Sequence, residues 1–375
     1  MATPSRRSIL ATAATVGFGT VAGCLGDSGQ SALTDETNPA GDVEPALTVD
    51  ISETAGGSGP PVVDRTLPRD YEFGALVDAA QSGGPPQDGI PSIDSPSFND
   101  ADSPPAGLGE ASPVFGVDIE GDVRAYPQYI LVWHEIVNDI VGDESVAVTY
   151  CPLTGTAQGF YRGNVTFGVS GQLINSNLVM FDRATESWWP QMLAEGIQGP
   201  HENDTLEEFQ IVWTTWERWK AEYPDTLVLN ENTGAARNYG ADPYGSYDPV
   251  NGYYEDDNTL FPPLQTDDRF PPKEVVIGTR NQDGASCINK DQLREERIIE
   301  GSLDGIGYTC VYDEALDTGY VYRNPDEVAV RTAGAEYEVD DSSYAADALP
   351  LPREIGYDAM WFAWFGYYPS TEVLA

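Results

Sequence analysis

Two distant stretches of this chain resemble each other, and this similarity constrains the fold more than any other feature. Residues 216–229 read WERWKAEYPDTLVL and residues 361–374 read WFAWFGYYPSTEVL, with seven of the fourteen positions identical. Both contain two tryptophans three residues apart, followed by a Tyr-Pro step that would end a helix. Self-similarity at a fixed offset is the signature of an internal repeat. The sequence therefore predicts two related units, at about 114–229 and 275–374.

A weaker correspondence, in the same order along the chain, continues upstream of these stretches. Residues 276–293 correspond roughly to VFGVDIEGDVRAYPQYIL, and residues 307–323 correspond roughly to VTYCPLTGTAQGFYR, which pairs Cys151 with Cys310. Because related units of this size bury their apolar faces best against each other, we expect two degenerate repeats packed into one compact body.

Short apolar runs separated by turn residues dominate the chain, which predicts a β-rich α+β fold. PVFGVDIEGDVRAYP suggests a hairpin around Gly121, and SVAVTYC, NVTFGVSGQL and NLVMFDR read as strands. Two segments instead have apolar residues spaced three and four apart, as in a helix. These are ILVWHEIVNDIV, residues 130–141, and the segment that contains Trp213, Trp216 and Trp219.

The N-terminus resembles an export signal. SRRSIL, residues 5–10, resembles the twin-arginine signature, and a short apolar stretch leads to VAGC, which resembles a lipoprotein box. We predict that residues 1–24 are this signal and that Cys24 is lipidated. The protein would then be exported and anchored to the outer face of the cytoplasmic membrane. A short transmembrane anchor is the alternative, but the apolar run is short and rich in Gly, Ala and Thr.

The composition after this signal is strongly acidic. Residues 25–66 lack a sustained apolar period and are predicted to be a flexible linker, and residues 67–375 form the predicted folded domain. The chain has 61 acidic and 19 basic residues, for a net charge of −42. This balance argues against nucleic-acid binding, which needs a basic face. Acidic residues in nearly every segment predict a halophilic surface, adapted to high salt, where self-repulsion is screened.

The first unit carries the polar motifs, so we place any chemistry there. In HEIVND, His134 and Asn138 would share one face of the predicted helix. In CPLTGTA, Cys151 could be a nucleophile or a metal ligand. Thr154 and Thr156 in the same motif could bind a ligand through hydroxyl and backbone N–H groups.

Two readings of these motifs remain open. Because the chain has only two histidines, a three-histidine zinc site is excluded. A Cys151–His134 catalytic pair, or a single metal ion held by the same two residues, is compatible with the sequence, with Arg183 and Asn138 as orienting or binding groups. The alternative is that Cys151 is a buried strand residue beside a tight turn and that His134 and Asn138 bind the backbone.

Taken together, the motifs resemble a known family. GGPPQDGIPSIDSPSF, VRAYPQYILVWHEIVNDIVG, VAVTYCPLTGTAQGFYR, FGVSGQLINSNLVMFDRATESWWPQ and MWFAWFGYYPSTEVL are together similar to the DUF3179 family, a family of unknown function. The resemblance covers about residues 67–375. Many members have Cys-Pro-Leu-Cys where this chain has Cys151-Pro152-Leu153-Thr154. The resemblance therefore implies that a role common to all members uses Cys151 alone.

We expect a membrane-tethered extracytoplasmic domain that binds a small ligand or a metal ion at a Cys/His site in the first unit, with enzymatic activity left open. The alternative is a structural or partner-binding surface lipoprotein without a catalytic site. The membrane is the expected partner, through the lipid anchor.

Overall fold

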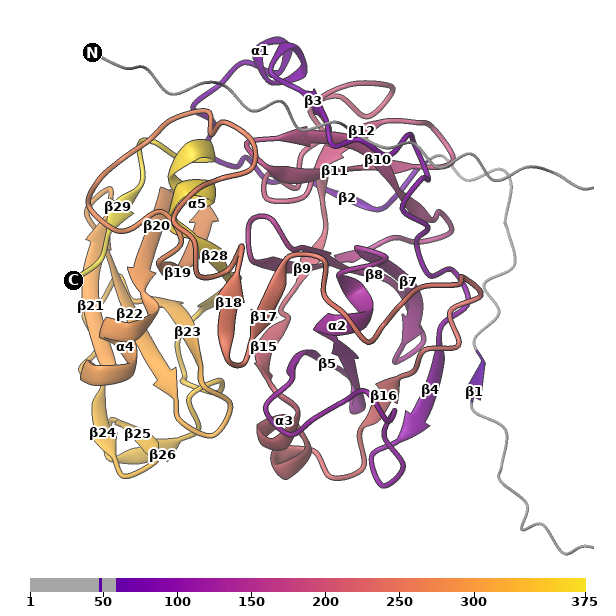
Figure 1. Cartoon of the computed structure of the whole chain (residues 1–375). Coiled ribbons are helices and arrows are strands. Elements are labelled where there is room, and N and C mark those ends of the chain that lie inside the picture. Colours follow the sequence, from indigo (N-terminus) through magenta and orange to yellow (C-terminus); the bar gives the residue numbers. More distant parts are fainter. Residues whose placement is uncertain (1–46, 49–58) are drawn as a thin grey trace, which may run out of the picture. The chain divides into compact units, whose positions relative to one another are not determined.

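The computed structural model describes residues 47–48 and 59–375. The predicted signal over 1–24, with Cys24, and most of the predicted linker at 25–66 lie outside these described residues. Strands arranged in several sheets predominate over short helices (Figure 1), which confirms the strand-rich fold. None of the helices in the described part of the chain is long and apolar enough to cross a membrane.

The first half of the body, β5 to β16, begins with the predicted hairpin. Strands β5 (Pro113–Ile119) and β6 (Asp122–Pro127) pair antiparallel on either side of Gly121, whose φ of 86° suits glycine. The short helix α2 (Gln128–Leu131) leads into a meander of β7 (Ile136–Val141), β8 (Glu144–Cys151) and β9 (Thr156–Tyr161). Three strands and a helix complete the half: β14 (Glu208–Phe209) on β9, β15 (Val212–Thr215) on β5, α3 (Trp216–Glu222), and β16 (Leu227–Leu229) parallel to β6.

A further sheet is inserted within this half. Strands β10 (Phe167–Ile174) and β11 (Asn177–Asp182) form a hairpin, with β12 (Trp188–Pro190) and β3 (Gln81–Ser82) at its edges. Strand β4 (Ser97–Asp100) lies between β16 and β1 (Leu47–Thr48), and β2 (Val62–Val63) pairs with β13 (Thr205–Leu206). Helix α1 (Phe73–Asp78) precedes β3.

The second half, β19 to β29, follows a hairpin of β17 (Gly245–Tyr247) and β18 (Val250–Gly252). Its elements are β19 (Val275–Asn281), β20 (Gly284–Asn289), α4 (Lys290–Glu296), β21 (Ile298–Leu303), β22 (Ile306–Asp313), β23 (Thr318–Arg323), β27 (Arg353–Glu354), β28 (Gly356–Met360), α5 (Trp361–Tyr367) and β29 (Glu372–Val373). A small sheet of β24 (Arg331–Ala333), β25 (Glu336–Val339) and β26 (Ser342–Tyr344) is inserted after β23.

The strand pairings of the two halves follow the same order. One sheet of the first half contains the series β15-β5-β6-β16 and the matching sheet of the second half is β28-β19-β20-β29, each with a parallel last pair. In each half an indole N–H donates to a threonine oxygen; these pairs are Trp219 to Thr226 (3.0 Å) and Trp364 to Thr371 (2.9 Å). Each indole also fills the space beside a glycine where a Cβ would collide; these glycines are Gly116 and Gly278.

The helix predicted over residues 130–141 is wrong. Helix α2 ends at Leu131, and Ile136–Val141 is strand β7. Five of the six residues in β7 are buried, because the strand is covered on both faces. A strand buried on both faces does not alternate apolar and polar residues, so its apolar run can imitate a helical spacing.

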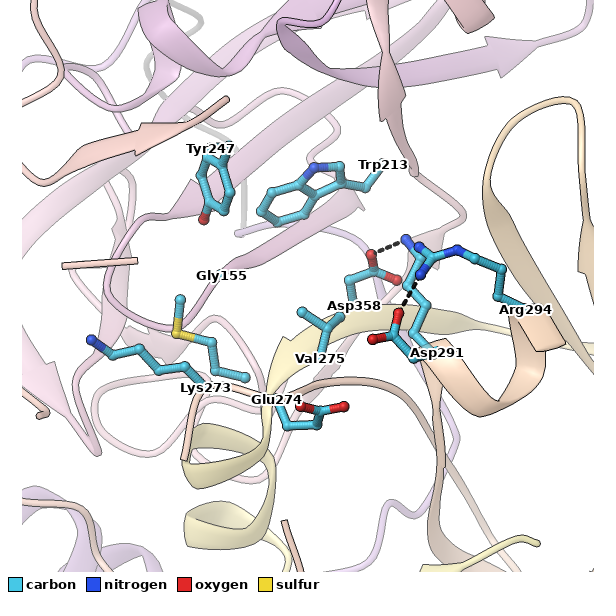
Figure 2. A pocket seen from close by; sticks show the side chains of 11 residues that line it. Gly155, Trp213, Tyr247, Lys273, Glu274, Val275, Asp291, Arg294 and Asp358 are labelled. Atoms are coloured by element: carbon cyan, nitrogen blue, oxygen red, sulfur yellow. Dashed lines mark hydrogen bonds and ion pairs between the residues drawn. The ribbon is translucent and has the colours of Figure 1, made fainter. Parts of the chain in front are cut away.

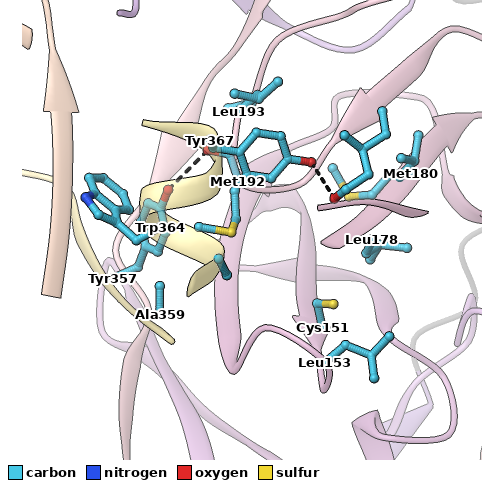
Figure 3. Packing of buried hydrophobic residues seen from close by; sticks show 14 of the residues in the cluster. Cys151, Leu153, Leu178, Met180, Met192, Leu193, Tyr357, Ala359, Trp364 and Tyr367 are labelled. Atoms are coloured by element: carbon cyan, nitrogen blue, oxygen red, sulfur yellow. Dashed lines mark hydrogen bonds between the residues drawn. The ribbon is translucent and has the colours of Figure 1, made fainter. Parts of the chain in front are cut away.

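The largest apolar cluster contains residues of both halves. Cys151 and Leu178 belong to it from the first half, and Tyr357, Trp364 and Tyr367 from the second (Figure 3). The hydroxyl of Tyr367 donates to the carbonyl oxygen of Ile174 in β10 at 2.9 Å. The core thus holds the β10–β11 hairpin against α5 and places Cys151 beside this contact.

Candidate functional site

Glu135 occupies the turn between α2 and β7. Its φ of 59° lies in the left-handed region, which a residue with a side chain adopts only when the surrounding structure enforces it. Its N–H donates to the carbonyl oxygen of Leu131 at 2.7 Å, and its carbonyl oxygen accepts from the N–H of Tyr150 at 2.7 Å. Because both bonds fix the turn, the Glu135 side chain is held inside the fold, where the residue is 7% exposed.

The Glu135 side chain lines a cavity of about 360 Å³, which we call the Glu135 pocket. Apart from Glu135 and Gln172, its walls are glycine, proline, aliphatic side chains and two aromatic rings. The wall residues are Gly83, Pro85, Ile90, Leu153, Val169, Gly171, Leu173, Leu178, Tyr244, Leu260 and Phe261. This volume and lining are typical of pockets for small, mostly apolar ligands.

The Glu135 carboxyl is electrostatically uncompensated. Burial alone raises its pKa from 4.5 to about 8. In the described part of the chain the carboxyl forms no side-chain hydrogen bond and no ion pair. A buried ionised group without a partner is costly, so it remains protonated at neutral pH. A hydrogen-bond donor or a cation in the pocket would therefore convert the Glu135 carboxyl from its protonated form to its charged form.

Cys151 ends strand β8 beside this carboxyl. The residue is 1% exposed and its thiol is free, with Sγ 3.6 Å from the carbonyl oxygen of Ser176. Burial, and to a smaller extent the Glu135 charge, raise the pKa of the thiol to about 11, and the Thr154 hydroxyl opposes this shift. The Cys151 side chain is thus a neutral thiol in the unliganded protein, and a positive charge nearby would be needed to form the thiolate.

The turn after Cys151 rests on a buried polar network. The hydroxyls of Thr154 and Thr156 lie 2.8 Å apart, and Thr156 donates to the Gln191 side chain at 2.7 Å. The Asn177 amide donates to Thr154 at 3.1 Å and to Gln191 at 2.9 Å. All four residues are fully buried. Because each member has a partner, the network fixes the turn and joins β9 to β11 rather than facing the cavity.

His134 has partners other than Cys151. Its Nδ1 lies 2.7 Å from the Pro91 carbonyl oxygen, so Nδ1 carries the proton. Its Nε2 then accepts from the Tyr239 hydroxyl at 2.6 Å, and that hydroxyl lies 2.6 Å from the Thr233 hydroxyl. The imidazole therefore joins the loop before β4 to the loop after β16. Burial lowers its pKa, which keeps it neutral.

Asn138 and Arg183 also hold the chain together. The Asn138 side chain donates to the Phe167 carbonyl oxygen at 2.9 Å and accepts from the Phe167 N–H at 2.9 Å, which connects β7 to β10. Arg183 donates to Asp88 at 2.8 Å and to Ser92 at 2.9 Å, which pins the proline-rich loop. Both side chains join separate segments of the protein, and their positions favour a structural role.

The structure thus brings Cys151 together with Thr154 and Thr156, as their adjacency in the sequence suggests, and adds Glu135. It engages His134, Asn138 and Arg183 elsewhere. Within residues 47–48 and 59–375, no group of three or more His, Cys, Asp or Glu side chains is arranged to hold a metal ion. Glu135 follows His134 in HEIVND. A helix over this segment would place Glu135 on the same face as Asp139, whereas the observed turn at Glu135 brings it near Cys151.

The family model DUF3179, described as a protein of unknown function, matches residues 87–371. The matched range includes Glu135, Cys151 and every wall residue of the Glu135 pocket except Gly83 and Pro85. No curated protein and no solved structure matches the chain.

Proposed function

The chain belongs to the DUF3179 family of proteins of unknown function, and we propose that it binds a small apolar amine in the Glu135 pocket. One observation carries this proposal: a buried carboxyl that has no hydrogen-bond partner or counter-ion among the described residues lines a largely apolar cavity. Ionisation of such a group destabilises the fold. Proteins retain destabilising groups of this kind mainly at functional sites, where a ligand interacts with them.

The protonation of Glu135 favours an amine over other head groups. Raising its pKa from 4.5 to about 8 corresponds to a preference of about 5 kcal/mol for the protonated form. A ligand ammonium would restore the carboxylate and recover part of this energy as a charge-assisted hydrogen bond. The net charge of −42 also favours cations near the protein and disfavours anions.

An ammonium in the pocket would also act on the Cys151 thiol. The Glu135 charge raises the pKa of this thiol. Above about pH 8, where Glu135 is charged in the unliganded protein, an ammonium paired with the carboxylate would offset this charge and lower the thiol pKa. Cys151 would then report on ligand binding through its reactivity, and the same effect would prepare it as a nucleophile. The wall residues Leu153 and Leu178 would cover the apolar part of the ligand.

The test uses benzylamine, with benzyl alcohol as a neutral probe of the same shape. We expect calorimetry to detect benzylamine binding to the wild-type protein. Below the pKa of Glu135 the affinity should increase as the pH rises, by up to about tenfold per pH unit, because the carboxyl must lose one proton when the ammonium binds. Glu135→Gln should weaken binding by about tenfold or more, which is about 1.4 kcal/mol. The matched control is Glu144→Gln, at an exposed position of β8, which should leave the affinity unchanged.

Equal affinities for benzylamine and benzyl alcohol would refute the amine class. Equal binding by the wild-type protein and Glu135→Gln would refute the site. Absence of binding by both probes would favour the alternative reading, a structural or partner-binding lipoprotein whose polar motifs only pack the core.

We also propose that the domain is exported and tethered to the outer face of the cytoplasmic membrane by lipidated Cys24, with a surface adapted to high salt. The twin-arginine-like residues 5–10 and the acidic composition support this. Mass spectrometry of the membrane fraction should find a diacylglyceryl group on Cys24. A protein that fractionates with membranes unchanged after Cys24→Ser would contradict the lipid anchor.

Finally, we propose that the two halves are degenerate copies of one unit. The seven identities between 216–229 and 361–374 support this, together with the matching order of strand pairing and the two indole–threonine bonds.

A further inference from the structure

A second cavity, of about 290 Å³, lies between the two halves and is distinct from the Glu135 pocket. Figure 2 shows Trp213 and Tyr247 on one side and Asp358, Asp291 and Arg294 on the other. We call this cavity the Trp213 pocket. The proposed amine site does not use it, although Gly155 of the CPLTGTA motif lines it.

The aromatic side of the Trp213 pocket is rigid. The indole of Trp213 packs edge-on against the rings of Phe115 at 5.0 Å and Tyr247 at 5.5 Å. The Tyr247 ring stacks on Tyr254 at 4.0 Å, and its hydroxyl lies 3.2 Å from that of Tyr150. The indole N–H has no hydrogen-bond partner among the described residues. The wall therefore offers a fixed apolar surface.

The opposite side is polar but electrically balanced. Lys290 donates to Oδ2 of Asp358 at 2.6 Å, and both side chains are 9% exposed. This bond engages one ammonium proton and one carboxylate oxygen, which leaves further donors and an acceptor for a ligand. Three basic and three acidic side chains line the whole cavity. In a chain with only 19 basic residues and a net charge of −42, this local neutrality is unusual.

We infer that the Trp213 pocket binds a neutral polyhydroxylated molecule the size of a monosaccharide. Each hydroxyl both donates and accepts, so one hydroxyl can bridge the Lys290 ammonium and the Asp358 carboxylate. The apolar C–H face of the sugar ring would pack on the Trp213 indole. Balanced charges favour a neutral ligand over an ion, since an ion would meet a like charge within the same cavity. The volume suits one sugar ring rather than a long chain.

The test blocks the cavity without disturbing the core. Val275 lines the cavity and is 38% exposed, so Val275→Trp should fill the cavity without a core clash. The matched control is Val62→Trp, since Val62 is 44% exposed and is not among the residues that line the pocket. Binding of D-glucose, D-galactose, D-mannose and N-acetylglucosamine is followed by saturation-transfer NMR, with glycine betaine and citrate as zwitterionic and anionic probes. Circular dichroism verifies that both variants are folded.

We expect at least one of the four sugars to bind the wild-type protein and the Val62→Trp variant, with signal lost in Val275→Trp. The double variant Lys290→Gln/Asp358→Asn removes both charges and retains polar side chains, and should weaken sugar binding about tenfold. Glu135→Gln should leave it unchanged, because Glu135 lies in the other cavity. Failure of all four sugars to bind, binding that survives Val275→Trp, or stronger binding of glycine betaine or citrate would each overturn the inference.

Discussion

Replacing Glu135 by glutamine should change how the stability of this protein depends on pH. The folded-state pKa of Glu135 is about 8, against 4.5 for the free group. The folded state holds this proton more tightly than the unfolded state. The stability that Glu135 contributes is therefore fully present below about pH 4.5 and is lost as the pH rises towards 8. Linkage gives a loss of about 3 kcal/mol between about pH 5 and about pH 8 from this one group.

Glutamine has nearly the same shape and cannot ionise, so Glu135→Gln should not show this loss. Its free energy of unfolding, relative to that of the wild-type protein, should rise by about 3 kcal/mol over the same range. The assay is urea unfolding of both proteins, followed by tryptophan fluorescence, in buffers of equal and high KCl concentration. All other titrating groups are common to both proteins and cancel in the difference.

The exposed Glu144, replaced by glutamine, serves as the control and should give a difference that does not vary with pH. A Glu135→Gln difference that is equally constant from about pH 5 to about pH 8 would refute the reasoning. It would mean that the Glu135 carboxyl is solvated or paired in solution, and the proposed amine site would lose its physical basis.

Three further predictions concern other parts of the molecule. Thr226→Val and Thr371→Val should each lower the free energy of unfolding by about 1–2 kcal/mol, because each leaves a buried indole N–H unpaired; clearly unequal losses in urea unfolding would argue against equivalent roles in the two halves. Burial lowers the folded-state pKa of His134 below 6.5, so stability should fall as the pH drops below about 6.5, where only the unfolded chain binds the proton; His134→Gln should show a smaller fall. In a Cys24→Ser chain, the buried thiols should react slowly with a thiol reagent at about pH 8 until urea is added, because burial keeps them protonated and raises the pKa of Cys151 to about 11. Benzylamine should accelerate the reaction at Cys151. Rapid labelling of Cys151 without benzylamine would contradict its burial.

Local sequence patterns predicted much of the fold correctly. The hairpin at Gly121 and the strands that end at Cys151 and Asp182 follow from short apolar runs bounded by turn residues, which depend on near neighbours in the chain. The helix over 130–141 failed for a tertiary reason. The burial of β7 depends on β10, which packs against it, and on the loop around Ile93, which pairs with its edge, and both lie outside its own sequence.

The candidate site, like the fold, was predicted from the sequence only in part. The sequence by itself determined that Cys151 is followed by a turn, because Pro152 fixes its own φ and Gly155 adopts at little cost the positive φ that a turn requires. Only the tertiary structure decided which acid acts electrostatically on the thiol. The left-handed turn at Glu135 and the arrival of Tyr244, about one hundred residues later, enclose that carboxyl in an apolar cavity. Desolvation depends on everything that surrounds a group, and no local pattern carries that information.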